Sequence, residues 1–238
     1  MLSVVIPALN AASTLAETIA AVAATATEMV VVDAGSTDAT ASVARDAGAR
    51  VCTAPRGRGA QLAAGVAAAR APWLLLLHAD TVLAPDWPEA AARHIAAGPA
   101  RAGYFRFALA SPDPRARRLE RAVVWRCRVL ALPYGDQGLL IHRDLLAAVG
   151  GIRPLPLMED VDLIRRLGRA RIAPLAASAV TSASRWERDG WWRRSARNLV
   201  CLAAWFAGVP PARIARLYRS PARVARHEPP ARVARHEQ

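Results

Sequence analysis

Residues 30–38 read VVVDAGSTD, a run of valines that stops at an aspartate and a glycine-containing turn. Similar apolar runs lie at 2–7, 50–53 and 73–77, and alanine-rich segments with helical spacing separate them. Continuous apolar strands that alternate with helices of about 10 to 15 residues are typical of a parallel sheet covered on both faces. The sequence therefore predicts an α/β protein with a Rossmann-like, mostly parallel sheet flanked by helices.

Polar side chains gather just past the ends of these predicted strands. They are Asn10, Asp33, Ser36, Asp38, His78 and Asp80. In open parallel sheets, ligands bind beyond the carboxyl ends of the strands. We therefore expect a ligand site at this edge of the sheet.

Two of these positions suggest specific chemistry. Asp80 follows a buried strand, where a carboxylate needs compensation such as a hard cation that also binds a diphosphate. The alternative is that Asp80 only caps the next turn. Asp33, which precedes the turn at Gly35, could accept hydrogen bonds from a base or a ribose, or could simply close that turn.

Three other segments carry candidate functional groups. Glu159, Asp160 and Asp162 begin a predicted helix, where acids either act as a general base or favourably oppose the helix dipole. Residues 185–186 pair an arginine with a tryptophan, a combination suited to a diphosphate and a sugar face. Residues 134–138, YGDQG, form a polar loop bracketed by glycines.

The composition is strongly basic and uneven. The 238 residues include 32 arginines, no lysine and 19 acids, which gives a net charge of +13. Residues 1–119 carry a charge of +2 and residues 120–238 a charge of +11. Such an excess suits a nucleic-acid binder, or an enzyme that handles phosphorylated or membrane-bound anionic substrates.

Membrane insertion and export are not indicated. The longest apolar run near the C-terminus, at 199–209, is about half of the ~20 residues that a span needs. Three widely spaced cysteines favour a reducing compartment, and no signal-peptide pattern is visible. We therefore expect a cytoplasmic protein, in solution or at the inner face of the membrane.

In the predicted helix at 191–206, positions 199, 202, 205 and 206 share one face, which either packs on the sheet or lies at a lipid interface.

The order of the motifs resembles the family 2 glycosyltransferases of the GT-A fold. The matching segments are VVIPALN at 4–10, VVVDAGSTD at 30–38, GRGAQ at 57–61, LHADT at 77–81, MED at 158–160 and SRW at 184–186. The chain departs from the family pattern in three places. Ala11 stands where an acid often follows Asn10, and His78 replaces the first acid of the Asp-x-Asp motif. Residues 182–184 replace a Gln-x-x segment, which argues against a processive polysaccharide synthase.

The resemblance implies a role for each matching residue. Asp33 would read the nucleotide base, Asp80 with His78 would form the metal site, and Asp160 would be the catalytic base beside Glu159. Arg185 and Trp186 would belong to the catalytic machinery. The remaining nucleotide-sugar-binding residues would be Pro7, Ala8, Asn10, Gly35, Ser36, Asp38, Arg58, Gly59, Gln61 and Ala79.

The implied organisation has three parts. A GT-A nucleotide-sugar-binding and catalytic domain would span 1–187, and a helical basic C-terminal extension would span 188–220. The tail at 221–238 contains the octapeptide PARVARHE twice, and we expect it to be disordered.

The implied activity is that of an inverting hexosyltransferase that uses Mg²⁺ or Mn²⁺. It would move a sugar from a UDP-type donor to a hydroxyl acceptor, which is either soluble or lipid-linked. A lipid-linked acceptor would imply that the enzyme contacts the membrane peripherally. No nucleic-acid partner is expected for this activity. Two alternatives remain. A nucleotidyltransferase of similar architecture would place a basic, glycine-rich loop at 8–12, where the chain reads ALNAA. A non-enzymatic nucleic-acid-binding protein would leave Asp33, Asp80 and Asp160 without a purpose.

Overall fold

A computed structural model describes residues 1–219 of the protein. The strands of this part are β1 (Leu2–Ala8), β2 (Glu28–Asp33), β3 (Arg50–Thr53), β4 (Trp73–Leu76), β5 (Thr81–Leu83), β6 (Ala102–Ala110), β7 (Leu139–His142) and β8 (Ile172–Ser182). They form one eight-stranded sheet in the order β3-β2-β1-β4-β7-β6-β8-β5. Strands β1 to β4 run parallel, as do β6 and β8, whereas β7 and β5 are antiparallel to their neighbours.

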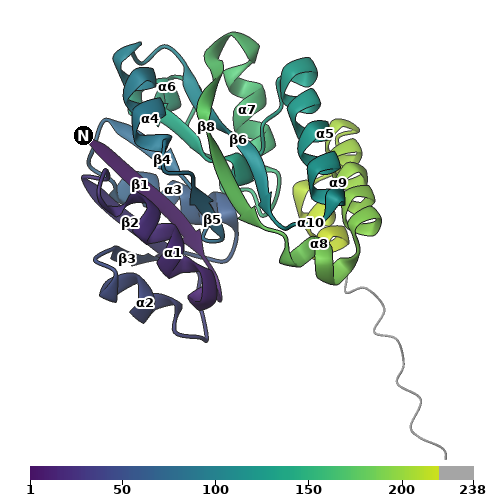
Figure 1. Ribbon diagram of the computed structural model, residues 1–238, viewed down its shortest axis with the longest axis horizontal. Helices are drawn as coiled ribbons and strands as arrows, with labels where there is room; N and C mark the ends of the chain where they lie inside the picture. The colour runs from purple at the N-terminus through teal and green to yellow at the C-terminus, as the bar shows by residue number, and fades with distance from the viewer. Residues whose placement is uncertain (220–238) are drawn as a thin grey trace, which may run out of the picture.

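Helices cover both faces of the sheet. One face carries α1 (Ala12–Ala23), α2 (Thr40–Asp46) and α4 (Trp87–Ala96), and Figure 1 shows α1 and α2 in front of the strands. The other face carries α3 (Arg58–Ala68), α5 (Pro114–Leu130), α6 (Arg143–Ala148), α7 (Glu159–Leu167), α8 (Ser184–Asp189) and α9 (Trp191–Phe206). Helix α10 (Pro211–Arg219) packs on α9, and two short 3-10 turns, η1 (Gly135–Gln137) and η2 (Arg169–Arg171), complete the described part.

The apolar strands are explained by this double cover. In β1, Val5 belongs to the core under α3, whereas Val4 and Ile6 belong to the core under α1. Every residue of β1 is therefore buried, and no polar alternation is left in its sequence. A Cβ at Gly65 of α3 would collide with Val5, so glycine is what lets this helix approach the sheet so closely.

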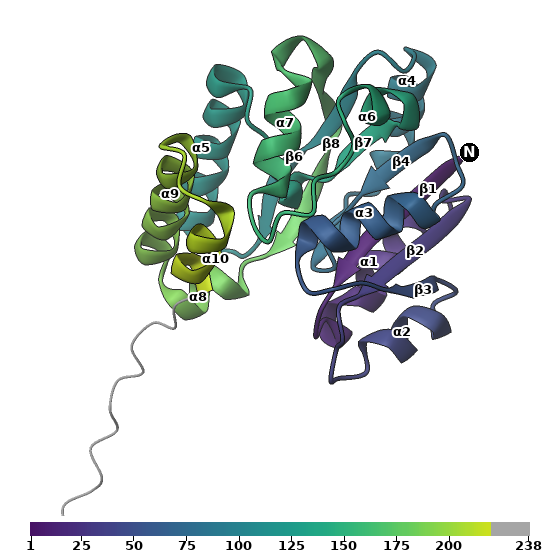
Figure 2. The ribbon, with the colours of Figure 1, turned by 180° about the vertical axis from the view of Figure 1, so that it is seen from behind.

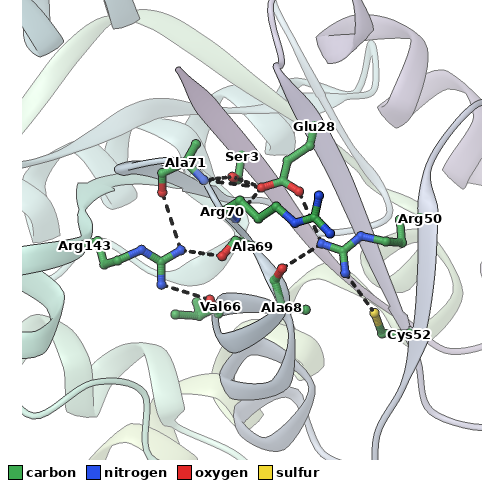
Figure 3. A network of polar contacts seen from close by, with 10 residues as sticks. All are labelled: Ser3, Glu28, Arg50, Cys52, Val66, Ala68, Ala69, Arg70, Ala71 and Arg143. Carbon is green, nitrogen blue, oxygen red and sulfur yellow. Dashed lines mark hydrogen bonds and ion pairs between the residues drawn. The ribbon is translucent and has the colours of Figure 1, made fainter.

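A polar network ties the amino ends of the central strands together (Figure 3). Glu28 accepts hydrogen bonds from the Ser3 hydroxyl at 2.5 Å, from the Arg50 guanidinium at 3.2 Å and from the Arg70 backbone N–H. Burial alone would raise the pKa of Glu28, but these hydrogen bonds outweigh it and leave the pKa below its usual value. On the far side of α3, Arg143 donates to the carbonyls of residues 66, 69 and 71. This network lies at the edge opposite the strand ends that the sequence marks as functional.

The predicted α/β architecture is confirmed, with three local differences. Strand β5 and helix α6 were not predicted from the sequence. Residues 184–189 form the short helix α8, which was likewise not predicted. The predicted tail at 221–238 lies outside the described residues. Within residues 1–219, no helix combines the length and the apolar character that crossing a membrane requires.

Candidate active site

The loops that follow β1 and β2 are joined by hydrogen bonds. The side-chain oxygen of Asn10 accepts from the Thr37 backbone N–H at 2.9 Å, and the Asn10 N–H donates to the Ser36 hydroxyl at 2.9 Å. Asp38 accepts from the backbone N–H of Ala12 at 3.2 Å. Asn10 has a positive φ of 51°, a conformation that asparagine adopts more readily than most residues. The sheet thus brings together the first group of predicted nucleotide-binding residues.

Asp33 closes the turn that follows β2. Its buried carboxylate accepts from the backbone N–H groups of Gly35 and Ser36, each at 3.1 Å, and from the Ser36 hydroxyl. Gly35 has a φ of +79°, which glycine adopts without strain. The turn-closing role considered from the sequence is therefore real, and the predicted contact with a nucleotide base stays a prediction.

Several other predicted donor-binding residues are occupied within the protein. The Gln61 amide donates to the carbonyls of Ala8 and Val32, both at 2.8 Å, and so holds the ends of β1 and β2 to α3. A Cβ at Gly59 would lie 2.6 Å from the Leu155 backbone nitrogen, so this glycine serves close packing. Pro7, Ala8 and Ala79 are buried beneath the loops.

A cavity of about 90 Å³ lies beyond the end of β4 and joins segments that are distant in sequence. His78 and Asp80 come from the end of β4, and Asp160 comes from the first turn of α7. The wall also includes Arg185 and Trp186 of α8. All of the predicted catalytic and metal-binding residues except Glu159 therefore line one cavity.

Glu159 lies beneath the cavity and pairs with Arg58. The distance from Arg58 Nε to Glu159 Oε1 is 2.8 Å, and the Glu159 side chain is 1% exposed. Burial raises the pKa of Glu159 to about 7, and the neighbouring guanidinium opposes this rise. Because an arginine does not give up its proton, the ion pair favours the ionised form of Glu159. This pairing occupies the arginine that was predicted to bind the donor, and that role stays a prediction.

The Asp160 carboxylate is fixed by backbone groups. Oδ2 accepts from the Gly135 N–H and Oδ1 accepts from the Val161 N–H, both at 2.8 Å. A Cβ at Gly135 would lie 2.8 Å from His78 Nε2 and 3.3 Å from Asp160 Oδ2. Glycine at this position thus lets the η1 turn come close enough to orient Asp160. Each carboxylate oxygen keeps a second lone pair for a substrate proton.

Asp80 and His78 form the polar end of β4. Asp80 Oδ2 lies 3.4 Å from Arg185 Nη2, and the Asp80 side chain is 21% exposed. Burial, helped by the positive charge of Arg58, lowers the pKa of His78 to about 4, so its imidazole is neutral at pH 7.

These two residues fit a divalent metal only together with outside ligands. Among residues 1–219, no group of three or more His, Cys, Asp or Glu side chains is arranged to hold a metal ion. One carboxylate and one neutral imidazole are nevertheless suitable donors, and a hard cation bound to a diphosphate needs few protein ligands. The donor set therefore fits a cation that arrives with a nucleotide.

Asp136 lines the same cavity and was not predicted from the sequence as a site residue. Its Oδ1 atom is buried and has no hydrogen-bond partner within residues 1–219. Burial raises the pKa of Asp136 to about 6, although Arg126 opposes this shift. The only sequence signal for Asp136 was the polar loop at 134–138. This signal did not indicate that the loop lies beside Asp80 and Asp160.

The sheet and the helices on both of its faces have the architecture of the GT-A fold. A family model described as Glycosyl transferase family 2 matches residues 3–152, more than half of the chain. The chain therefore belongs to glycosyl transferase family 2 and is a glycosyltransferase. No curated protein sequence matches the chain.

Solved structures of glucosyl-3-phosphoglycerate synthase from Mycobacterium tuberculosis share this fold. The complex with Mn²⁺, UDP and glucosyl-3-phosphoglycerate has a TM-score of 0.56 and 24% identity, over 76% of this chain and 70% of that chain. The complex with Mg²⁺ and UDP has a TM-score of 0.56 and 22% identity, over 76% and 69%. The complex with Mn²⁺, UDP-glucose and phosphoglyceric acid has a TM-score of 0.54 and 24% identity, over 73% and 68%. At these identities the likeness establishes the fold.

Arg58→Met tests the buried ion pair. The substitution leaves Glu159 buried without its cation, and we expect the free energy of unfolding to fall by about 3 kcal/mol at pH 8. The loss should be smaller at pH 5. Burial raises the pKa of Glu159 to about 7 even beside Arg58, and in the variant no guanidinium opposes this rise. At pH 5 Glu159 is therefore protonated in the folded variant, whereas the unfolded chain releases this proton above about pH 4.5. The unfolding free energy of the variant therefore falls as the pH rises through this window.

Urea denaturation at the two pH values measures this difference. Arg56→Met is the matched control, because Arg56 lies in the same loop and is exposed. It should change the unfolding free energy by less than about 0.5 kcal/mol. Equal losses for the two variants, or a larger loss for Arg58→Met at pH 5, would contradict the role of the pair.

Proposed function

We propose that the protein transfers a sugar, with inversion at C1, from a UDP-type donor to a hydroxyl acceptor. The observation that carries the proposal is the shared cavity, in which Asp80, Arg185 and Asp160 face one another. A diphosphate needs positive charge, and an attacking hydroxyl needs a base on the opposite side of the sugar. The cavity brings both kinds of group together.

The donor side is supported by the fold and by the solved relatives. The loops after β1 and β2 lie at the carboxyl edge of the parallel strands, where nucleotides bind in sheets of this kind. The Mycobacterium tuberculosis synthase binds UDP or UDP-glucose with Mn²⁺ or Mg²⁺. We assign the nucleoside to the side of Asn10 and Asp33, and the diphosphate to the side of Asp80.

Asp80 and His78 would hold Mg²⁺ or Mn²⁺, whose charge would offset that of the diphosphate when the ion is bound. Arg185 is placed to share this task. It now pairs with Asp80 at 3.4 Å, and its side chain is 48% exposed, so it can turn toward a diphosphate at little cost. The planar guanidinium suits bidentate contact with phosphate oxygens.

Asp160 would accept the proton of the acceptor hydroxyl. The hydroxyl oxygen then bonds to C1 of the sugar while the bond from C1 to the diphosphate oxygen breaks, and the nucleoside diphosphate leaves with that electron pair. The hydrogen bonds from Gly135 and Val161 hold the carboxylate in position for this step. Trp186 forms an apolar wall beside the sugar.

Asp80→Asn separates metal binding from folding. Asp80 is partly exposed and pairs only at 3.4 Å, so we expect the melting temperature to change little. The increase in UDP affinity on addition of Mn²⁺ should be lost, as measured by isothermal titration calorimetry. Asp86→Asn is the matched control, since Asp86 is an exposed acid on the next segment, and it should keep the effect of Mn²⁺. UDP binding to Asp80→Asn as tight as to the unchanged protein with Mn²⁺ would show that the metal site lies elsewhere.

Asp160→Asn and Asp136→Asn identify the proton acceptor. The hydrolysis of UDP-glucose in the presence of Mn²⁺, followed by UDP release, should fall about 10²-fold or more in Asp160→Asn, while UDP affinity stays within about twofold. Asp136→Asn should reduce hydrolysis much less. The opposite order of the two effects would transfer the base role to Asp136, and full activity of both variants would direct attention to Glu159→Gln.

A further inference from the structure

A larger cleft lies between α5 and α9, which stand side by side in both views (Figures 1 and 2). Its volume is about 470 Å³, within the range of about 300–1,000 Å³ that is usual for small-molecule sites. We call it the α5–α9 cleft. Leu119, Ala122 and Val123 line it from α5, and Trp192, Leu199 and Leu202 line it from α9.

The cleft explains an unusual exposure of apolar side chains. Trp125 is 59% exposed, Trp192 is 77% exposed and Leu199 is 65% exposed, and all three line the cleft. Exposed apolar side chains that are scattered singly are normal, whereas large ones gathered around one cleft indicate a binding site. The sequence placed positions 199 and 202 on one helical face, yet Leu202 is buried in the core and Leu199 is not. Helix α9 therefore packs against the core through Leu202, whereas Leu199 on the same face lines the cleft.

The cleft is continuous with the catalytic cavity. Tyr134, Asp136, Trp186 and Asn198 line both hollows. Asp136 stands at this junction with the buried, unpartnered Oδ1 atom described above. A molecule in the cleft therefore lies next to a residue whose Oδ1 atom lacks a hydrogen-bond donor within residues 1–219.

The charges of the cleft restrict its occupant. Arg118 and Arg126 line it, and neither forms an ion pair with an acid among residues 1–219. Arg126 instead lies over the Tyr134 ring, 3.4 Å from its centre, and donates to the Leu132 carbonyl at 2.8 Å. Arg115 lies 5.6 Å from the centre of the Trp191 ring and so bridges the two helices. A cationic occupant is disfavoured here.

We propose that the α5–α9 cleft binds the apolar body of the acceptor, which is an amphiphilic alcohol without positive charge. This proposal rests on the proposed function, because the hydroxyl of such a molecule reaches the cavity between Asp136 and Asp160. A flat membrane surface or a second copy of the chain would cover the exposed rim. Neither would use a concave space that leads to the two carboxylates, so we assign the cleft to a single small amphiphile.

Binding of alkane-1,2-diols, from propane-1,2-diol to decane-1,2-diol, tests the cleft without any donor. Four tryptophans, at 125, 186, 191 and 192, line the cleft and make intrinsic fluorescence a direct readout. We expect the affinity to rise by up to about fourfold with each added methylene group until the cleft is filled. Ala122→Phe should abolish this dependence on chain length, because it fills the cleft from an exposed position. Ala203→Phe, on an exposed part of α9 outside the cleft, is the matched control and should keep it.

The same diols are then added to UDP-glucose and Mn²⁺, and UDP release is measured. A rate that rises with chain length in the unchanged protein and in Ala203→Phe, but not in Ala122→Phe, supports the proposal. Diol binding without any UDP release contradicts the proposed transfer rather than the cleft. Affinity independent of chain length, equal loss in both variants, binding only to anionic vesicles, or a dimer that Ala122→Phe dissociates would each overturn the assignment of the cleft to the acceptor.

Discussion

The active site depends on one buried ion pair between two segments that lie about a hundred residues apart. Arg58 opens α3 and Glu159 opens α7, and their 2.8 Å contact joins the segment after β3 to the segment after α6. A carboxylate as buried as Glu159 is costly without a cation, so the pair fixes the start of α7. Asp160 is the next residue, and the Gly135 N–H then sets its direction. The position of Asp160, the proposed base, thus depends on the ion pair that the adjacent Glu159 forms with Arg58.

The two sides of the site are built by different principles. The donor side comes from parallel strands whose carboxyl ends meet at one edge, an arrangement shared with many nucleotide-binding sheets. The acceptor side comes from η1, α7, α8 and α9, which the sheet topology does not dictate. The match to the family model ends at residue 152, before Asp160, Arg185 and all of α9. The residues to which we assign the acceptor therefore lie largely outside the segment that the family model matches.

Much of the fold and part of the site could be predicted from the sequence. The apolar runs predicted β1, β2 and β4, because strands covered on both faces leave a signal that needs no knowledge of tertiary contacts. His78 and Asp80 could be predicted as site residues because they directly follow the buried strand β4, whose signal is equally local. The pairing of Arg58 with Glu159 could not be predicted, since each residue has a sound local explanation and only the tertiary fold brings them together. Asp136 could not be predicted because only the tertiary fold brings it into the cavity with Asp160. The cleft could not be predicted because helical spacing alone did not show that Leu199 would be left uncovered.

The central claim is that this cavity transfers a sugar with inversion at C1. Proton NMR during incubation of the protein with UDP-glucose and Mn²⁺ tests it directly, because the anomeric signals of α- and β-glucose are separate and water serves as the acceptor. The account predicts that β-glucose forms first from the α-linked donor, together with UDP, before the two anomers equilibrate. Initial formation of α-glucose would contradict inversion, and the absence of UDP release from any UDP-sugar tested in this way would contradict the assignment of the donor.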